Sequence, residues 1–446
     1  MKTPNTMARY ALAQPEILMP RPGADLSRWA VIACDQYTQD REYWKKTAEI
    51  VGSDPSILNI ILPEVYLEDA GRSERLASIR AAMAGYLGTG TGSDGVFGPP
   101  VRAFVYLERK TAYGRTRKGL MAAVDLDSYE WKPDSKALVR ATEATIVDRI
   151  PPRMEIRRGA PIESPHIMLL ANDPRKSLIE AAGEHVRSEK PLYSAELMHK
   201  AGSVTGWAIT DPGHIALMED ALENLAKENT AEDGSCFLFA VGDGNHSLAT
   251  AKAVWDEFRA AHAEEAAAGE IDLENHPARY ALVEIVNLYD DGLTFEPIHR
   301  VLFGTDARSL AAFLAEKLGG TVSKNIAPAE MEALVADPSV TRFGFVCADG
   351  CFVLETPHPA LAVSRLQPVL DDFLSAGEKV KIDYIHGTDE VFRLGKDAGT
   401  VSILLPPVAK DSFFSTIAGG GPLPRKSFSM GEASEKRFYM ESRKLF

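Results

Sequence analysis

Apolar residues near the middle of the chain change their spacing within a few positions. Residues 236–241 (Cys-Phe-Leu-Phe-Ala-Val) form a continuous apolar run of the length expected for a buried strand. Beyond residue 247, apolar side chains recur at helical spacing: Leu248, Ala251, Trp255 and Phe258. The pattern predicts a strand, a turn at residues 242–246 and a helix that starts near Ser247.

The predicted turn reads Gly242-Asp-Gly-Asn-His246. Its two glycines permit a tight turn, and the following helix presents backbone N–H groups and a positive dipole end, which together favour an anion. Asp243 would repel a bare phosphate, so an anion site here needs a cation or a proton-accepting role for the aspartate. The alternative is a structural turn in which Asp243 or Asn245 caps the helix.

Strand and helix patterns alternate through the rest of the chain. Strand runs occupy 29–34, 165–171 and 276–288, and helical periodicity covers 73–87, 176–190 and 215–227. This order predicts an α+β fold, with mixed α/β sheets covered by helices. We expect three domains: 1–134, 135–300 with the Gly-Asp-Gly-Asn-His turn, and 301–446 with a cationic tail.

Polar residues follow the first strand directly. Asp35, Gln36 and Tyr37 come after the run that ends at Cys34. Polar groups at the end of a buried strand often face a cleft, which makes these three candidate site residues. The alternative is that Thr38 or Asp40 caps the next helix.

Cationic residues concentrate in two further segments. Arg140 and Arg149 flank Glu143 in the segment 135–158, and Arg425-Lys426 lie in the tail. Arginine suits bidentate recognition of phosphate or carboxylate. The alternative for the first segment is a helix face covered with salt bridges of small energetic value.

Composition narrows the partner classes. The 446 residues are 45% hydrophobic and 25% charged, which is typical of soluble globular proteins. A net charge of −14 argues against broad nucleic-acid binding and leaves small molecules as the better partners. Four cysteines without a CxxC pair suit a reducing compartment. We find no signal-peptide or membrane-spanning pattern, so we expect a cytoplasmic protein with no membrane partner, and we leave homo-oligomer formation open.

Common catalytic motifs are missing from the sequence. It contains no HExxH, no GxxxxGK[ST], no GxSxG and no suitably placed GxGxxG. Acidic residues and arginines remain, and these are what phosphoryl transfer requires if they converge.

Several short sequence motifs resemble those of one bacterial family. They are Ala33-Cys-Asp-Gln-Tyr-Thr38, Gly242-Asp-Gly-Asn-His246, Asp383-Tyr-Ile-His-Gly387, residues 423–433 and Lys436-Arg-Phe-Tyr439. In this order they are similar to the family catalogued as domain of unknown function 1015. That family's Asp-Gly-His-His-Arg signature resembles the loop of the ParB/sulfiredoxin-like superfamily, in which related free-serine kinases use the loop beside bound phosphate.

The resemblance implies roles for individual residues. Asp243 would be the catalytic base or a metal ligand, and His246 with the loop amides would touch phosphate. Beside these we take Asp35 and His246 as catalytic candidates, Gly242, Gly244, Asn245 and Ser247 as phosphate-binding candidates, and Gln36, Tyr37, Glu143 and His386 as substrate-binding candidates. Ser247 stands where the family has an arginine, so positive charge would have to come from Arg140, Arg149, Arg425 or Lys426.

These observations lead to competing hypotheses. The first is a serine-kinase-like phosphotransferase that moves phosphate between ATP, ADP or pyrophosphate and a small hydroxylated metabolite, with Mg²⁺ as the ion and serine as the leading acceptor. The second is a non-catalytic regulatory protein that binds phosphate or a nucleotide. A nucleic-acid protein, by analogy with ParB, fits poorly with the acidic charge.

Overall fold

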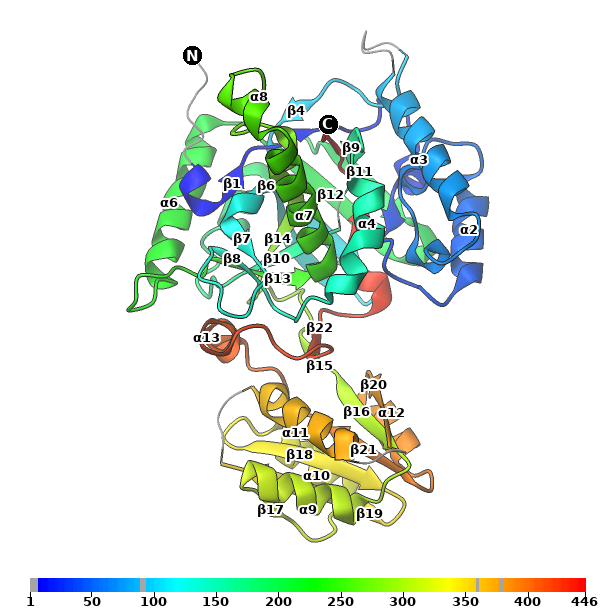
Figure 1. Ribbon diagram of the computed structural model, residues 1–446, viewed down its shortest axis with the longest axis vertical. Coiled ribbons are helices and arrows are strands. Elements are labelled where there is room, and N and C mark those ends of the chain that lie inside the picture. Colours follow the sequence, from blue (N-terminus) through cyan, green and yellow to red (C-terminus); the bar gives the residue numbers. More distant parts are fainter. Residues whose placement is uncertain (1–6, 89–93, 165, 358–360, 377–379) are drawn as a thin grey trace. The chain divides into compact units, whose positions relative to one another are not determined.

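The computed structural model describes residues 7–88, 94–164, 166–357, 361–376 and 380–446 (Figure 1). The chain divides into two compact units: unit 1 is Met1–Ala141, Thr145–Leu293 and Glu432–Phe446, and unit 2 is Thr142–Ala144 and Thr294–Gly431. The boundary expected near residue 300 lies close to the start of unit 2, whereas the one expected near 134 falls inside unit 1. Helices and mixed sheets make the fold α+β, as predicted.

Unit 1 is built on a large mixed sheet. Its strand order is β11-β12-β5-β6-β14-β10-β13-β8-β7, and β1 pairs with β6. The strands are β1 (Leu12–Ala13), β5 (Phe104–Thr111), β6 (Thr116–Asp125), β7 (Tyr129–Glu130), β8 (Val139–Ala141), β10 (Met168–Ala171), β11 (Tyr193–Leu197), β12 (Gly202–Ile209), β13 (Phe239–Asp243) and β14 (Tyr280–Asn287). The central strands β10 and β14 are almost entirely buried because aliphatic side chains fill both of their faces. Position 165, where we expected the β10 strand to begin, lies outside the described residues.

Helices cover this sheet. They are α1 (Leu26–Trp29), α2 (Arg41–Val51), α3 (Arg72–Leu87), α4 (Ile150–Arg157), α5 (Ile179–Val186), α6 (Pro212–Glu228), α7 (Asn245–Ala261) and α8 (Ala263–Ala267). Helix α7 buries Leu248, Ala251 and Trp255 in the main core, and α4 packs against it (Figure 1). The helical spacing read from the sequence therefore marks the face of α7 that turns inward.

Short strand pairs join distant segments of unit 1. Strand β3 (Val31–Ile32) pairs with β23 (Phe438–Tyr439), β9 (Ile162–Glu163) with β24 (Arg443–Lys444), and β2 (Glu16–Ile17) with β4 (Val101–Arg102). The indole of Trp29 also donates a hydrogen bond of 2.8 Å to the carbonyl of Met440. The segment 432–446 is therefore part of the same core as the first strands.

A buried charge network ties this segment to the sheet. Glu284 on β14 is 1% exposed and accepts from Arg437 at 2.6 Å and from Arg117 on β6 at 3.3 Å. Arg437 also pairs with Glu441. Burial acts to raise the pKa of Glu284, but the two arginines outweigh it and hold that pKa below its ordinary value.

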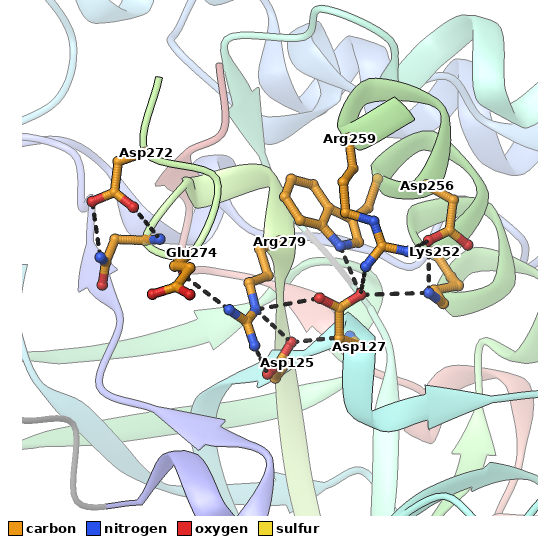
Figure 2. A network of polar contacts seen from close by, with 10 residues as sticks. Asp125, Asp127, Lys252, Asp256, Arg259, Asp272, Glu274 and Arg279 are labelled. Carbon is orange, nitrogen blue, oxygen red and sulfur yellow. Dashed lines mark hydrogen bonds and ion pairs between the residues drawn. The ribbon is translucent and has the colours of Figure 1, made fainter. Parts of the chain in front are cut away.

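A second network fixes α7 at the edge of the sheet (Figure 2). Asp127, in the 3₁₀ turn η4 (Leu126–Ser128), accepts from the indole of Trp255 at 2.9 Å and from Arg259 at 2.8 Å, both on α7. Arg279, in the turn η7 (Pro277–Arg279), pairs with Asp125 at 2.7 Å. These contacts join η4, α7 and the start of β14.

Unit 2 is a smaller sheet with helices. Its strand order is β17-β19-β18-β21-β16-β20. The elements are β16 (His299–Phe303), α9 (Ala307–Leu318), β17 (Thr321–Val322), α10 (Pro328–Ala336), β18 (Thr341–Cys347), β19 (Gly350–Thr356), α11 (Ala362–Ala376), β20 (Lys381–Ile385), α12 (Thr388–Gly395), β21 (Thr400–Leu404) and α13 (Lys410–Gly420), with the pair β15 (Glu296–Pro297) and β22 (Phe428–Ser429). Its core includes the stacked rings of Phe345 and Phe352. Throughout the described ranges of both units, no helix is long and apolar enough to span a bilayer.

Candidate functional site

Strand pairing brings three separate segments together in unit 1. Strand β10 runs antiparallel to β13, with Met168 opposite Asp243, so His166 just before β10 lies beside the end of β13. The pairing of β3 with β23 brings Tyr439 to the segment that follows β3, where the hydroxyl of Tyr439 accepts from the N–H of Cys34 at 3.1 Å, next to Asp35. The predicted turn, the polar residues after the first strand and the segment 436–439 thus meet in one region.

The turn 242–246 has the backbone that its glycines predict. Gly244 adopts a φ of +80°, and a Cβ there would lie 3.2 Å from Ile167. Helix α7 starts at Asn245, two residues before the expected start, and no side chain among the described residues caps its first turn. Asp243 accepts from the N–H of Gly244 at 3.0 Å, and its other oxygen lies 3.3 Å from the ammonium of Lys436. A carboxylate and a cation therefore stand together at the helix N-terminus.

His166 is the centre of a buried polar cluster. Its Nδ1 lies 2.7 Å from the hydroxyl of Tyr439, and its Nε2 lies 3.3 Å from Asp35 Oδ2 and 3.2 Å from Ser247 Oγ. The residue is 5% exposed. Burial acts to lower its pKa, but the charge and hydrogen bond of Asp35 raise the pKa well above the ordinary value. Against the opposing effect of burial, His166 in turn holds the pKa of Asp35 below its ordinary value.

The protonated imidazole decides which groups can donate. Both of its nitrogens carry hydrogen, so Nδ1 donates to Tyr439 and Nε2 donates toward Asp35 and Ser247. Ser247 then accepts with its oxygen and keeps its own hydroxyl hydrogen for another acceptor. Ser247 is in the first turn of α7, where an anion would sit.

His246 is neutral near pH 7. Its Nε2 accepts the N–H of Ile146 at 3.3 Å, which leaves the ring hydrogen on Nδ1. Burial and the nearby Arg153 and Arg149 lower the pKa of His246 to about 4. His246 can thus offer a neutral N–H donor to a phosphate but no positive charge.

The other candidates in unit 1 have diverse surroundings. Gln36 donates to Asp35 at 3.0 Å, and Tyr37 stacks on Tyr43 with ring centroids 3.9 Å apart. Asp40 caps α2 by accepting from the N–H of Tyr43, as the alternative interpretation of this segment expects. Arg140 donates to the carbonyl of Ala137 at 2.9 Å and covers the ring of Phe237, before the start of β13 and not at the Asp243 end.

Four candidates belong to unit 2 and are described there. Glu143 accepts the N–H of Ser427 at 3.3 Å, and the carbonyl of Lys426 accepts from the buried Arg300 at 2.9 Å. Arg425 is exposed beside Lys426, and His386 follows β20. In unit 1, the structure brings Lys436 to Asp243 and His166 to Ser247, and Arg149, one of the predicted cations, lies near His246.

Sequence reasoning missed His166 as a site residue and gave no role to Lys436 or Tyr439. His166 stood at the start of an apolar run and was read as part of a strand. The signal that could have revealed it is a histidine at the polar end of a strand next to β13. Lys436 and Tyr439 carried a signal in the phrase Lys436-Arg-Phe-Tyr439, although its pairing with the first strand requires the fold.

A cavity of about 150 Å³ opens beside His166. Its wall comes from the 3₁₀ turn η2 (Ile57–Ile60) and the segment after it, α3, α4, the segment 160–167 and α7. Cys34, His166, Ser247 and Tyr439 contribute to one part of this wall. The polar cluster thus borders a space that can hold part of a small molecule.

Among the described residues, no group of three or more His, Cys, Asp or Glu side chains lies close enough together to hold a metal ion. Mg²⁺ often takes only one or two carboxylates and completes its shell with phosphate oxygens and water. Asp243 fits such a partial role, although Lys436 already neutralises it.

A family profile described as "Protein of unknown function (DUF1015)" matches residues 18–373. The chain belongs to this family. Among solved structures, it is similar to a conserved hypothetical protein from Pyrococcus furiosus, with a TM-score of 0.35, 11% identity and coverage of 74% of this chain and 97% of that one. No curated protein matches the chain significantly.

Two further solved structures show similarity of the same kind. A free serine kinase in complex with AMP is similar to this chain, with a TM-score of 0.35 and 14% identity, over 73% of this chain and 91% of that one. SbnI with a C-terminal truncation, from Staphylococcus aureus, matches with a TM-score of 0.33 and 10% identity, over 70% and 83%.

Proposed function

We propose that this DUF1015 protein is a phosphotransferase that moves phosphate between a nucleotide or pyrophosphate and the hydroxyl group of a small metabolite. One observation carries the proposal: two carboxylate–cation pairs, Asp243–Lys436 and Asp35–His166, meet at the N-terminus of α7. Phosphoryl transfer depends on positioning and on positive charge around the transferred group, and this arrangement offers both. The resemblance of the turn to that of free-serine kinases supports serine as the first acceptor to test.

The first turn of α7 would bind the phosphate to be transferred. Its backbone N–H groups and helix dipole favour an anion, and Ser247 can donate its hydroxyl hydrogen while it accepts from His166. Lys436 adds the positive charge that an arginine in place of Ser247 would have supplied. Asp35 keeps His166 protonated, and thereby keeps Ser247 oriented as a donor.

The chemical step joins the acceptor hydroxyl to phosphorus. The hydroxyl oxygen forms a new P–O bond, the bond from phosphorus to the leaving oxygen breaks, and the hydroxyl proton passes to a carboxylate. Asp243 is the carboxylate at the helix N-terminus and takes this proton, or else acts as the protein ligand of Mg²⁺. When bound, Mg²⁺ supplies positive charge to the phosphate oxygens of the donor.

Phosphorus-31 NMR with serine and each of ATP, ADP and pyrophosphate tests the proposal. We expect phosphoserine with wild-type protein and a loss of about 100-fold or more in rate for Asp243→Asn. Asp256→Asn, which removes an exposed carboxylate on the same helix, is the matched control and should retain activity. Undiminished phosphorylation by Asp243→Asn would remove Asp243 from the mechanism. If excess Mg²⁺ restores the activity of Asp243→Asn, Asp243 is a metal ligand and not the base.

The second candidate function is a phosphate- or nucleotide-binding regulator without turnover. Serine in place of the family arginine favours it, because the loop then has no cation of its own. Isothermal calorimetry separates the two candidates. Binding of ATP, ADP or pyrophosphate with no product from any donor would support the regulator.

A further inference from the structure

The cavity beside His166 has one polar end and an apolar body. Ser247, His166 and Tyr439 line the polar end, and they are the same side chains that form the candidate site. A molecule in the cavity can therefore contact the imidazole–hydroxyl pair of His166 and Ser247. The cavity and the candidate site share these side chains, whereas Asp35, Asp243 and Lys436 are not among the residues that line the cavity.

Aliphatic side chains dominate the rest of the wall. Ile60, Leu62, Met83 and Ile162 are all buried and line it. These side chains offer dispersion contacts but no hydrogen bonds to a ligand. The part of a ligand that lies against them is therefore favoured to be hydrocarbon.

The charged residues of the wall neutralise one another. Arg157 Nη1 lies 2.5 Å from Glu163 Oε2, and Arg153 forms an ion pair with Glu64. Glu163 is also paired with the buried Arg443, which is not among the residues that line the cavity. Both arginines of the wall thus already have a carboxylate partner, which makes them less available to a second phosphate or carboxylate.

The size of the cavity sets the size of the ligand. The space measures about 150 Å³ and is open to solvent, so a ligand can enter it. An apolar cavity of about this volume can hold a benzene-sized molecule. Serine, with a single methylene group beside its hydroxyl, would leave most of the space empty.

We propose that the cavity binds the hydrocarbon part of a small alcohol, about six carbon atoms in size, whose hydroxyl lies at Ser247 and His166. The assignment of this alcohol as the phosphate acceptor rests on the proposed function. The binding of the alcohol in the cavity is independent of that function. The structure thus points to an acceptor class with a compact apolar body.

Calorimetry with primary alcohols from ethanol to 1-hexanol tests the proposal on the wild-type protein. Each buried methylene should raise affinity roughly fourfold until the cavity is full. Ala160→Leu fills part of the wall and should favour shorter alcohols, whereas Ala221→Leu, the same change at a buried alanine of α6 away from the cavity, should leave the series unchanged. A flat wild-type series, or equal losses in both variants, would overturn the proposal.

The two proposals fail in different ways. Chain-length-dependent binding without phosphate transfer from ATP, ADP or pyrophosphate would retain the cavity as an alcohol site and reject the phosphotransferase. Transfer to serine without any chain-length dependence would retain the phosphotransferase and reject the apolar acceptor. If Ala160→Leu does not fold, the wild-type series still decides the matter.

Discussion

Ser247 illustrates how one residue change alters the source of charge at a site. The resemblance expects an arginine at this position, and a serine there removes a fixed cation from the loop. His166 lies 3.2 Å from Ser247, and Lys436 lies 3.3 Å from Asp243. Both cations come from other segments of the chain. Positive charge at the N-terminus of α7 therefore depends on tertiary structure and not on the loop sequence.

The neutral His246 should make the protein less stable in acid. Its pKa is lowered to about 4 in the folded chain, against an ordinary value near 6.5 when unfolded. Between these pH values the unfolded chain binds a proton here that the folded chain does not, so the free energy of unfolding falls as pH falls. His246→Gln removes this contribution, and its stability should fall less steeply from pH 6.5 to 4.

Urea denaturation of both proteins across that pH range measures the effect. The two proteins should have the same slope of unfolding free energy against pH above pH 7, where His246 is neutral in both the folded and the unfolded chain. Parallel curves for wild type and variant throughout the range would contradict the assigned pKa shift.

Part of the site could be predicted from residue types alone. The glycines predicted a tight turn before the helix, and Gly244 has the positive φ that such a turn requires. The partner of Ser247 could not be found this way. A single buried histidine looks like any core residue until the strand pairing puts it beside the turn.

Helix α7 is the element that connects the site to the rest of unit 1. Its first turn forms the candidate site, and its middle is tied to the η4 turn through Asp127 (Figure 2). The strand–turn–helix order around it was predicted from periodicity, with a two-residue error at the start. Which strands flank β13 could not be predicted, because β8 and β10 are distant from it in sequence.

Removal of the Asp127 charge should weaken the attachment of α7 to the η4 turn and lower the stability of the protein. Asp127→Asn weakens the acceptor for Trp255 and leaves Arg259 with one fewer counter-ion, so we expect a loss of about 1–3 kcal/mol in the free energy of unfolding. Asp256→Asn on the same helix breaks only exposed pairs and should cost less than about 1 kcal/mol. Equal stability losses in urea denaturation would show that the Asp127 contacts add nothing.

Unit 1 is assembled from segments that the sequence separates widely. The expected division at residues 134 and 300 followed composition and local pattern, which carry no information on the pairing of β3 with β23 or β9 with β24. Long-range pairings of this kind depend on which buried faces match in three dimensions. The fold class was therefore predictable, whereas the interruption of unit 1 by residues 294–431 was not.

Glu284 should control the stability of unit 1 as a whole. Glu284→Gln leaves Arg117 and Arg437 buried without their shared counter-ion, and we expect a loss of about 3–5 kcal/mol. Hydrogen exchange should show reduced protection in β14 and in residues 437–441 and unchanged protection in unit 2. Glu390→Gln, at an exposed pair in unit 2, serves as the control. Unchanged exchange in β14 would contradict this role.

The pairing of β3 with β23 also sets an order of events during synthesis. A ribosome makes residues 294–431 after Asp35, His166 and Asp243, but before Lys436 and Tyr439. Until Lys436 emerges, Asp243 has no ammonium beside it, and until Tyr439 emerges, the imidazole of His166 lacks one of its three partners. The candidate site is therefore completed only when residues 436–439 have been added, after all residues of unit 2 have been made.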